Sequence, residues 1–199
     1  VLPLESGQSA TLARTDRDRL HKRQLVYTGV ARTPVCAIVA ALTVRGQSIP
    51  VMGELFATAD DAYLALGLAA EDSRDTATAD GRPRTAHCAR GRLARMVGED
   101  TETLTAAEIN QLADQIIAAQ ARCVADALEV NLAALAEANS SSPRDEPRLI
   151  FTGHGWELFE RARSLLPRPY EVFALPSVLS LEASRSAPAL AVAWLRARV

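Results

Sequence analysis

The sequence predicts an α/β protein, and the prediction rests on two patterns in its second half. Residues 105–138 carry apolar side chains at spacings of three and four, the period of an amphipathic helix. Two short apolar segments, 148–152 and 170–175, have the length of strands and alternate with predicted helices over 156–166 and 189–198. Such alternation is typical of an α/β layer. The 199 residues suffice for one large domain or two small lobes.

Composition narrows the class of protein. Hydrophobic residues make up 48% and charged residues 23%, which is ordinary for a globular chain. The net charge of −2 provides no overall basic field for nucleic acid or an acidic membrane, and no apolar run has membrane-spanning length. The three cysteines, Cys36, Cys88 and Cys123, form no CxxC pair and are expected to be buried free thiols. We therefore expect a cytoplasmic protein without nucleic-acid or membrane partners.

Residues 25–35 read LVYTGVARTPV, an apolar run that breaks at Gly29 and continues as a polar, basic segment. This pattern predicts a strand that delivers a loop to a site. Gly29 allows backbone N–H groups to point outward in a concave array that suits an anion. Arg32 supplies a forked cation, and Thr28 and Thr33 supply hydroxyls. A surface turn before a proline-initiated segment is the competing interpretation.

The connecting elements follow from turn and cap residues. Apolar segments 36–44 and 48–52 flank an Arg-Gly-Gln turn and predict a hairpin. Residues 69–84 are rich in Asp, Ser, Thr, Gly and Pro, which predicts a linker or a lid over a site. Thr105 and Glu108 form a capping box at the start of the long helix over 105–138.

Acidic residues mark the start of another predicted helix. Thr58 is positioned to cap it, with Asp60 and Asp61 in the first turn, where the helix dipole favours negative charge. Glu54, Asp60 and Asp61 also have the chemistry to bind magnesium or a cationic group. Capping explains the two aspartates equally well without a ligand.

The predicted helix over 85–98 is basic. Arg92 and Arg95 are three residues apart and share a face, so they either pair with the acidic loop before them or clamp a phosphate. His87 is a candidate general base, although a histidine in a first helical turn is more often incidental.

A Gly-x-Gly turn, Gly153-His154-Gly155, separates a predicted strand from a predicted helix. At such a turn the backbone passes close to a ligand, and the helix offers free N–H groups. A tight turn without any ligand is the competing interpretation.

Several motifs, in order along nearly the whole chain, resemble one known family. They are LVYTGVARTPV at 25–35, PVMGELFATADDAYLALG at 50–67, ADGRP at 79–83 and RLARMVG at 92–98. The chain resembles proteins of tetrahydromethanopterin-linked one-carbon transfer, in the hydantoinase A/oxoprolinase group of the acetate and sugar kinase, heat-shock ATPase and actin superfamily. The resemblance implies one lobe of an actin- or sugar-kinase-like (ribonuclease H-like) fold, with the hairpin and a helical insertion.

The resemblance also implies an activity. Its archaeal members are methanofuran-pathway synthases, which join the phenol of γ-glutamyltyramine to an aminomethyl-furan methyl diphosphate and release diphosphate. A small diphosphate and a phenolic amine are therefore the expected partners. The residues that match the YTGVxRTP signature, and that we expect to bind substrate or phosphate, are Tyr27, Thr28, Gly29, Arg32 and Thr33.

Two further signatures imply cofactors. Glu54, Asp60 and Asp61 match ELFAT-x-x-D, and the two aspartates are the expected ligands of Mg²⁺. Gly153 and Gly155 match the turn that lies against a nucleoside in kinases of this fold, so ATP is a second expected cofactor. In the expected mechanism, Arg32 and Mg²⁺ neutralise the leaving diphosphate. Glu54 or His87 takes the phenolic proton.

Family members carry an Asp-x-Gly-x-Thr-Thr-x-Asp-like phosphate loop upstream of a TDxxRL segment, and this sequence starts at or after that point. We therefore expect a single-domain fragment that is completed by an N-terminal lobe or a partner chain. Two other classes stay open. One is an ATP-dependent, amidohydrolase-like ring opener. The other is a non-catalytic subunit, which predicts an exposed apolar surface near residues 1–4 and formation of a homo-oligomer by the isolated chain.

Overall fold

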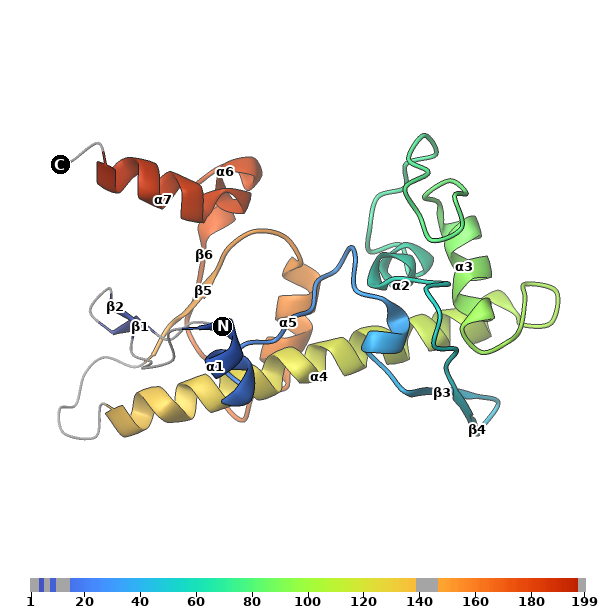
Figure 1. Cartoon of the computed structure of the whole chain (residues 1–199), viewed down its shortest axis with the longest axis horizontal. Helices are drawn as coiled ribbons and strands as arrows, with labels where there is room; N and C mark the ends of the chain where they lie inside the picture. Colours follow the sequence, from blue (N-terminus) through green and yellow to red (C-terminus); the bar gives the residue numbers. More distant parts are fainter. Residues whose placement is uncertain (1–3, 6–7, 10–14, 139–146, 197–199) are drawn as a thin grey trace. The chain divides into compact units, whose positions relative to one another are not determined.

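Helices and strands alternate along the chain in a helix-rich, mixed α/β arrangement (Figure 1). The computed structural model describes residues 4–5, 8–9, 15–138 and 147–196. The elements in order are β1 (Leu4–Glu5), β2 (Gln8–Ser9), α1 (Asp16–His21), η1 (Val35–Ala37), β3 (Ala41–Val44), β4 (Gln47–Pro50), α2 (Ala59–Ala65), α3 (Ala86–Arg95), α4 (Ala106–Ala138), β5 (Leu149–Phe151), α5 (Trp156–Ser164), β6 (Val172–Ala174), η2 (Leu175–Ser177), α6 (Leu181–Arg185) and α7 (Ala187–Arg196). The predicted α/β class is confirmed, whereas one lobe of an actin-like fold stays a prediction.

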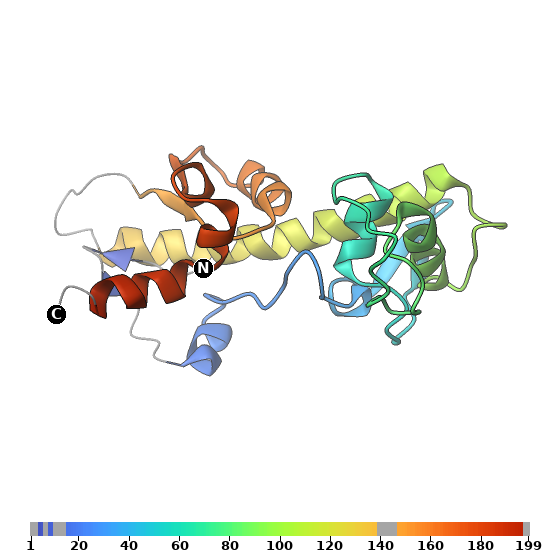
Figure 2. The ribbon, with the colours of Figure 1, turned by 90° about the horizontal axis from the view of Figure 1, so that it is seen from above.

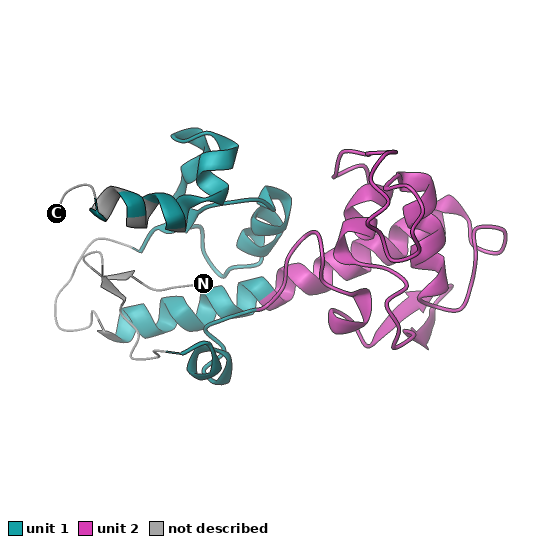
Figure 3. Ribbon diagram, turned by 45° about the horizontal axis from the view of Figure 1, so that its top comes forward, with its two compact units in different colours: residues 1–26, 124–199 teal, residues 27–123 magenta. Residues whose placement is uncertain are grey.

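The chain divides into two compact units (Figure 3). Residues 27–123 form the first, here called the middle unit, and residues 1–26 with 124–199 form the second, here called the terminal unit. Each is described below by itself. None of the helices in the described part of the chain combines the length and the apolar character needed to cross a membrane.

The core of the middle unit lies where α2 and α3 pack alongside the first part of α4 (Figure 2). Its buried side chains are mostly alanine, leucine and isoleucine, among them Ala62, Leu64, Leu93, Ile109, Leu112 and Ile116. Small alanine side chains let the helix backbones approach closely, which suits a chain with only 5% aromatic residues.

The predicted hairpin is confirmed in β3 and β4, which pair antiparallel. Its two-residue turn has Arg45 and Gly46 at φ of 50° and 79°, the positive values that a tight hairpin turn requires. The first strand is shorter than predicted, because residues 35–37 form the turn η1 instead. On the open edge of β3, the Gln115 side chain accepts from the Thr43 N–H at 2.8 Å and donates to the Thr43 carbonyl at 3.0 Å. That edge is thereby covered.

Glu108 joins the hairpin turn to the start of α4. The predicted capping box is confirmed: the Thr105 N–H donates to Glu108 Oε2 at 2.8 Å, and the Glu108 N–H donates to Thr105 Oγ1 at 3.3 Å. Arg45 Nε donates to Glu108 Oε1 at 2.7 Å. The Arg45 hydrogen bond first, and then those of Thr105, lower the pKa of Glu108 to about 2.

Glu108→Gln should flatten the acid limb of the stability profile. Because the pKa of Glu108 is lower in the folded protein, its stabilising contribution is complete above its ordinary pKa of 4.5 and is lost as the pH falls toward 2. Urea unfolding at about pH 7 and about pH 3 measures the difference in the free energy of unfolding. The exposed neighbour Glu102→Gln is the control. An equal acid dependence in both variants would contradict this role for Glu108.

The described part of the terminal unit contains a β5–α5–β6 segment, in which the two strands pair in parallel with Leu149 opposite Val172. Leu149 and Phe151 are buried on one face of this sheet, and Leu158 and Ala162 of α5 are buried as well. The strand, Gly-x-Gly turn and helix predicted for this region are therefore confirmed.

Two expectations need correction, and a third is not tested. The strand predicted at the start of segment 25–35 does not form: residues 25–27 have no regular secondary structure, and none of the described strands pairs with them. The cysteines are free, but Cys123 is exposed on α4 and the other two are only half-buried. The apolar surface expected near residues 1–4 lies outside the residues whose side chains the structure describes.

Candidate functional site

A buried glutamine holds the loop over residues 28–33, here called the Thr28 loop. The Gln120 amide, on α4, donates to Thr28 Oγ1 at 2.7 Å and to the Gly29 carbonyl at 3.0 Å. Its oxygen accepts from the Tyr63 hydroxyl at 3.1 Å. The Gly29 N–H donates to Thr33 Oγ1 at 2.9 Å, and that hydroxyl donates back to the Gly29 carbonyl. The Gly29 N–H is therefore engaged inside the loop and is not available to an anion, while an anion-binding array of the other N–H groups there stays a prediction.

The Thr28 loop is joined to the start of α2. The Ala59 N–H donates to the Thr33 carbonyl at 2.8 Å, and Pro34 and Thr58 form an isolated antiparallel bridge. The structure thus brings the YTGVxRTP and ELFAT-x-x-D signatures side by side. Nothing local in the sequence predicts this, because the contact depends on how residues 34–58 fold between the two signatures.

Two side chains, one just before the Thr28 loop and one within it, face solvent. Tyr27 is 86% exposed, and Arg32 is also exposed. In the part of the chain that the structure describes, no hydrogen bond or ion pair joins the Arg32 guanidinium to another residue. Arg32 is therefore a cation on a tethered loop with its donors available to a ligand.

Gln120→Leu should loosen the Thr28 loop and cost about 1–3 kcal/mol of stability, because it removes the buried hydrogen bonds of the Gln120 side chain to Tyr63, Thr28 and Gly29. Limited trypsin digestion should then cleave faster after Arg32, and urea unfolding measures the loss. Gln111→Leu, at an exposed position of the same helix, is the control. Cleavage after Arg32 at the wild-type rate would show that Gln120 does not hold the loop.

The acidic start of α2 is neutralised by arginines. Arg84 forms a two-pronged pair with Asp60, with Nε–Oδ2 at 2.6 Å and Nη2–Oδ1 at 2.5 Å. Arg92 Nε donates to Asp61 Oδ1 at 2.8 Å, while Asp61 Oδ2 accepts from the Thr58 N–H at 2.9 Å, the reciprocal half of a capping box. The capping interpretation is confirmed for Asp61, whereas Asp60 lies in the first turn and pairs with Arg84.

Asp80 connects the predicted linker to α3. Arg92 Nη1 lies 3.0 Å from Asp80 Oδ1, and Arg95 Nη1 lies 3.8 Å from Asp80 Oδ2. The Arg92 side chain is fully buried, so it cannot clamp a phosphate, and the alternative that these arginines pair with the acidic loop is confirmed. The Arg84–Asp60 ion pair joins segment 69–84 to α2, and an isolated bridge between Asp72 and Arg84 closes the segment on itself.

The electrostatics of this buried network follow from its geometry. Burial opposes the charge of Arg92, but Asp61 and Asp80 raise the pKa of its guanidinium above the ordinary value. Burial raises the pKa of the Asp61 carboxyl, against the hydrogen bonds from Arg92 and Thr58. Despite some burial, the Arg82 N–H and the Arg92 guanidinium hold the pKa of Asp80 below its usual range.

The two carboxylates expected to bind Mg²⁺ do not form a metal site in this geometry. Asp60 and Asp61 each already bind a guanidinium, and no group of three His, Cys, Asp or Glu side chains among the described residues is arranged to hold a metal. Sequence reasoning missed Asp80 and Arg84, the residues that complete these pairs. Their only signal was a charge-rich segment between two helices.

The two candidate bases are both exposed in the middle unit. Glu54 precedes α2 by a few residues, and His87 lies in the first turn of α3. Neither side chain makes a hydrogen bond or ion pair with another described residue. The geometry therefore leaves both free to accept a proton and does not choose between them.

The Gly-x-Gly turn belongs to the terminal unit. Gly153 and Gly155 have φ of 87° and 86°, which only glycine adopts readily. The Gly153 N–H donates to Ser184 Oγ at 2.9 Å, and Arg185 Nε donates to His154 Nδ1 at 3.1 Å. Burial first, and then the Arg185 charge, lower the pKa of His154. The turn is thus held by α6, and the Gly153 N–H is not available to a nucleotide.

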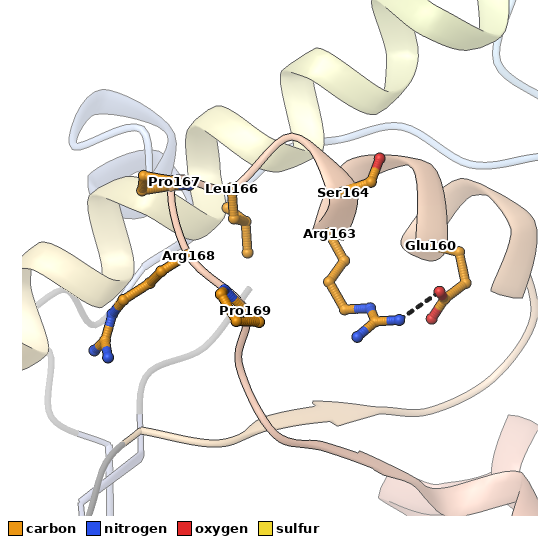
Figure 4. A pocket seen from close by; sticks show the side chains of 7 residues that line it. All are labelled: Glu160, Arg163, Ser164, Leu166, Pro167, Arg168 and Pro169. Atoms are coloured by element: carbon orange, nitrogen blue, oxygen red, sulfur yellow. Dashed lines mark hydrogen bonds and ion pairs between the residues drawn. The ribbon is translucent and has the colours of Figure 1, made fainter.

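A shallow pocket in the terminal unit contains none of the predicted site residues (Figure 4). It is lined by Glu160, Arg163, Ser164, Leu166, Pro167, Arg168 and Pro169. Arg163 is paired with Glu160 at 2.6 Å, and Arg168 lies over the Tyr170 ring at 4.7 Å. Both cations therefore have partners within the chain.

Comparison with known proteins links the chain to one enzyme name. No family model matches it. It is 25% identical over 195 residues to the (4-{4-[2-(gamma-L-glutamylamino)ethyl]phenoxymethyl}furan-2-yl)methanamine synthase of Methanocaldococcus jannaschii. The matched residues cover 98% of this chain and 55% of that protein. It is 23% identical over 197 residues to the Methanococcus vannielii protein of the same name, covering 98% of this chain and 84% of the relative. The chain thus spans about half the length of the first relative.

The predicted resemblance to these synthases is confirmed by the two likenesses. Membership of the hydantoinase, kinase and actin superfamily stays a prediction, because neither relative's name refers to it.

Proposed function

We propose that the chain is part of a transferase in the biosynthesis of a methanofuran-type one-carbon cofactor. It joins a furan-methyl diphosphate to the phenol of a tyramine derivative and releases diphosphate. The observation that carries this proposal is the similarity along 98% of the chain to two synthases of that name. Their product name contains a phenoxymethyl-furan group, which is the ether that such a transfer forms. The chain spans about half of one relative. The activity is therefore proposed for the complete species, by which we mean this chain together with any polypeptide that is continuous with it or bound to it in its cells.

The reaction breaks one C–O bond and forms another. The bond between the furan methylene carbon and the diphosphate breaks, and its electron pair leaves with the diphosphate. The phenol oxygen then bonds to the methylene carbon and loses its proton to a base. The transition state gains negative charge on the leaving diphosphate, so a cation placed there lowers the barrier.

Arg32 is the residue proposed to meet that charge. Its guanidinium is exposed and free of partners among the described residues, while Gln120 and Thr33 hold the loop that carries it. A planar guanidinium donates two parallel hydrogen bonds to phosphate oxygens, which positions the leaving group as well as stabilising it. The Thr28 and Thr33 hydroxyls help to position the loop, since the first accepts from Gln120 and the second exchanges hydrogen bonds with Gly29.

Glu54 and His87 are the candidates for the base. A free phenol has a pKa of about 10, so a carboxylate or neutral imidazole within hydrogen-bond reach assists its ionisation at neutral pH. Neither side chain has a partner among the described residues that would compete for the proton.

A diphosphate-release assay tests the proposal. The complete species, isolated from its own cells, is incubated with the aminomethyl-furan methyl diphosphate and γ-glutamyltyramine. Equal amounts of diphosphate and ether product, detected by mass, are expected. Diphosphate release without the phenol would indicate hydrolysis, and no product from the complete species would contradict the proposal.

An ATP-dependent hydrolase receives no support from these observations. Both relatives carry the synthase name, and the Gly153 N–H is already bonded to Ser184. ADP should therefore leave the thermal midpoint unchanged.

A further inference from the structure

The sheet formed by β5 and β6 is unusual for a parallel pair. Parallel sheets are normally covered on both faces, and a pair of strands alone is marginal in water. Among the described elements this sheet has only its two strands. Its inner face is buried through Leu149 and Phe151, which are 7% and 9% exposed.

The outer face of the same sheet is apolar and open. Ile150 and Phe173 lie directly opposite each other in the register, so their side chains are on one face. They are 62% and 47% exposed, although both residue types are usually buried in strands. Because parallel sheets are normally covered on both faces, this open apolar face is where a covering layer would pack.

The outer edge of β5 also has no strand partner among the described residues. The Leu149 N–H donates to the Glu171 carbonyl at 2.9 Å, so the backbone groups of Leu149 point toward β6. Because a strand alternates, the N–H and C=O of Ile150 point to the opposite edge. Within the described residues nothing bonds to them. The outer edge of β6 differs, since the Ala174 carbonyl accepts from Ser177 Oγ at 2.7 Å.

We propose that β5 is an interior strand of a larger sheet. A strand from polypeptide outside this chain pairs with β5 along the edge at Ile150, and its layer covers Ile150 and Phe173. The proposed occupant is polypeptide that corresponds to the part of the relatives that this chain does not match, since the chain spans 55% of one relative and 84% of the other. An added strand supplies both missing features together, namely backbone partners and apolar cover.

Amide hydrogen exchange tests this directly and requires no enzymatic activity. It is measured on the 199-residue chain and on the species isolated natively from its cells, with any polypeptide that is continuous with it or bound to it. The Ile150 amide should exchange about tenfold or more slowly in the native species, because a new hydrogen bond protects it. The Leu149 amide, bonded to β6 in both samples, should change little.

Matched variants separate this surface from general stability. Ile150→Lys should lower the thermal midpoint of the native species and leave that of the 199-residue chain unchanged. Leu20→Lys, at a 48% exposed apolar position on α1, should affect neither.

Three results would overturn the proposal. One is equal exchange of the Ile150 amide in both samples. Another is protection in the 199-residue chain that rises with its concentration, which would identify a second copy as the occupant. The third is a native species that consists of the 199-residue chain alone.

Discussion

Arg92→Met should destabilise the middle unit by about 3–5 kcal/mol, the cost typical of breaking a buried ion pair from one side. The Arg92 side chain is fully buried and binds two carboxylates, Asp61 on α2 and Asp80 in the segment before α3. Its removal leaves Asp61, which is 3% exposed, as a buried charge without a counter-ion. Urea unfolding, monitored by the circular dichroism signal of the helices, measures the loss in the free energy of unfolding.

Two variants establish that the loss comes from the unpaired charge. Arg95→Ala removes a cation that is 44% exposed and lies 3.8 Å from Asp80, so it should cost at most about 1 kcal/mol. Arg92→Met combined with Asp61→Asn should recover part of the stability, because the amide oxygen of asparagine still accepts from the Thr58 N–H while the charge is gone. A loss for Arg92→Met no larger than that for Arg95→Ala would refute the buried-pair account.

Arg32→Ala should reduce turnover of the complete species by about 10²–10³-fold, the range seen when a donor to a developing charge is removed. Its free energy of unfolding should change little, because Arg32 is exposed and has no partner among the described residues. Initial rates of diphosphate release, together with urea unfolding, measure the two quantities.

Two arginine variants serve as comparisons for Arg32. Arg32→Lys keeps the charge but loses the planar fork, so an intermediate rate is expected. Arg122→Ala removes an exposed arginine of α4 in the same unit and should leave the rate unchanged. If Arg32→Ala and Arg122→Ala turn over equally fast, Arg32 has no role at the diphosphate.

Sequence reasoning succeeded where a structure depends on nearby residues. Such features are the helix cap at Thr58, the capping box at Thr105, the hairpin turn at Arg45-Gly46 and the turn at 153–155, each of which involves positions within four residues of one another. The helix α4 was also predictable, because its apolar residues repeat over 33 positions. Local backbone chemistry is sufficient for such features.

The same reasoning failed at residues 25–27. Their apolar, β-branched character predicts a strand, but a strand needs a neighbour, and none of the described strands lies beside them. The loop that follows is held by Gln120, which is 92 residues from Thr28 in sequence. Propensity therefore predicted a strand where the fold supplies no neighbouring strand among the described residues.

The candidate site also separates what nearby residues determine from what contacts between distant residues determine. By itself the sequence determined which charged residues are present and their local spacing, including Asp60 and Asp61 in a first helical turn and Arg92 and Arg95 on one face. Only the tertiary structure decided that Asp61 and Arg92, 31 residues apart, neutralise each other, while Arg32 faces solvent. A carboxylate binds a metal or a guanidinium according to which one the fold brings within about 3 Å, and that distance is set by packing across the whole unit.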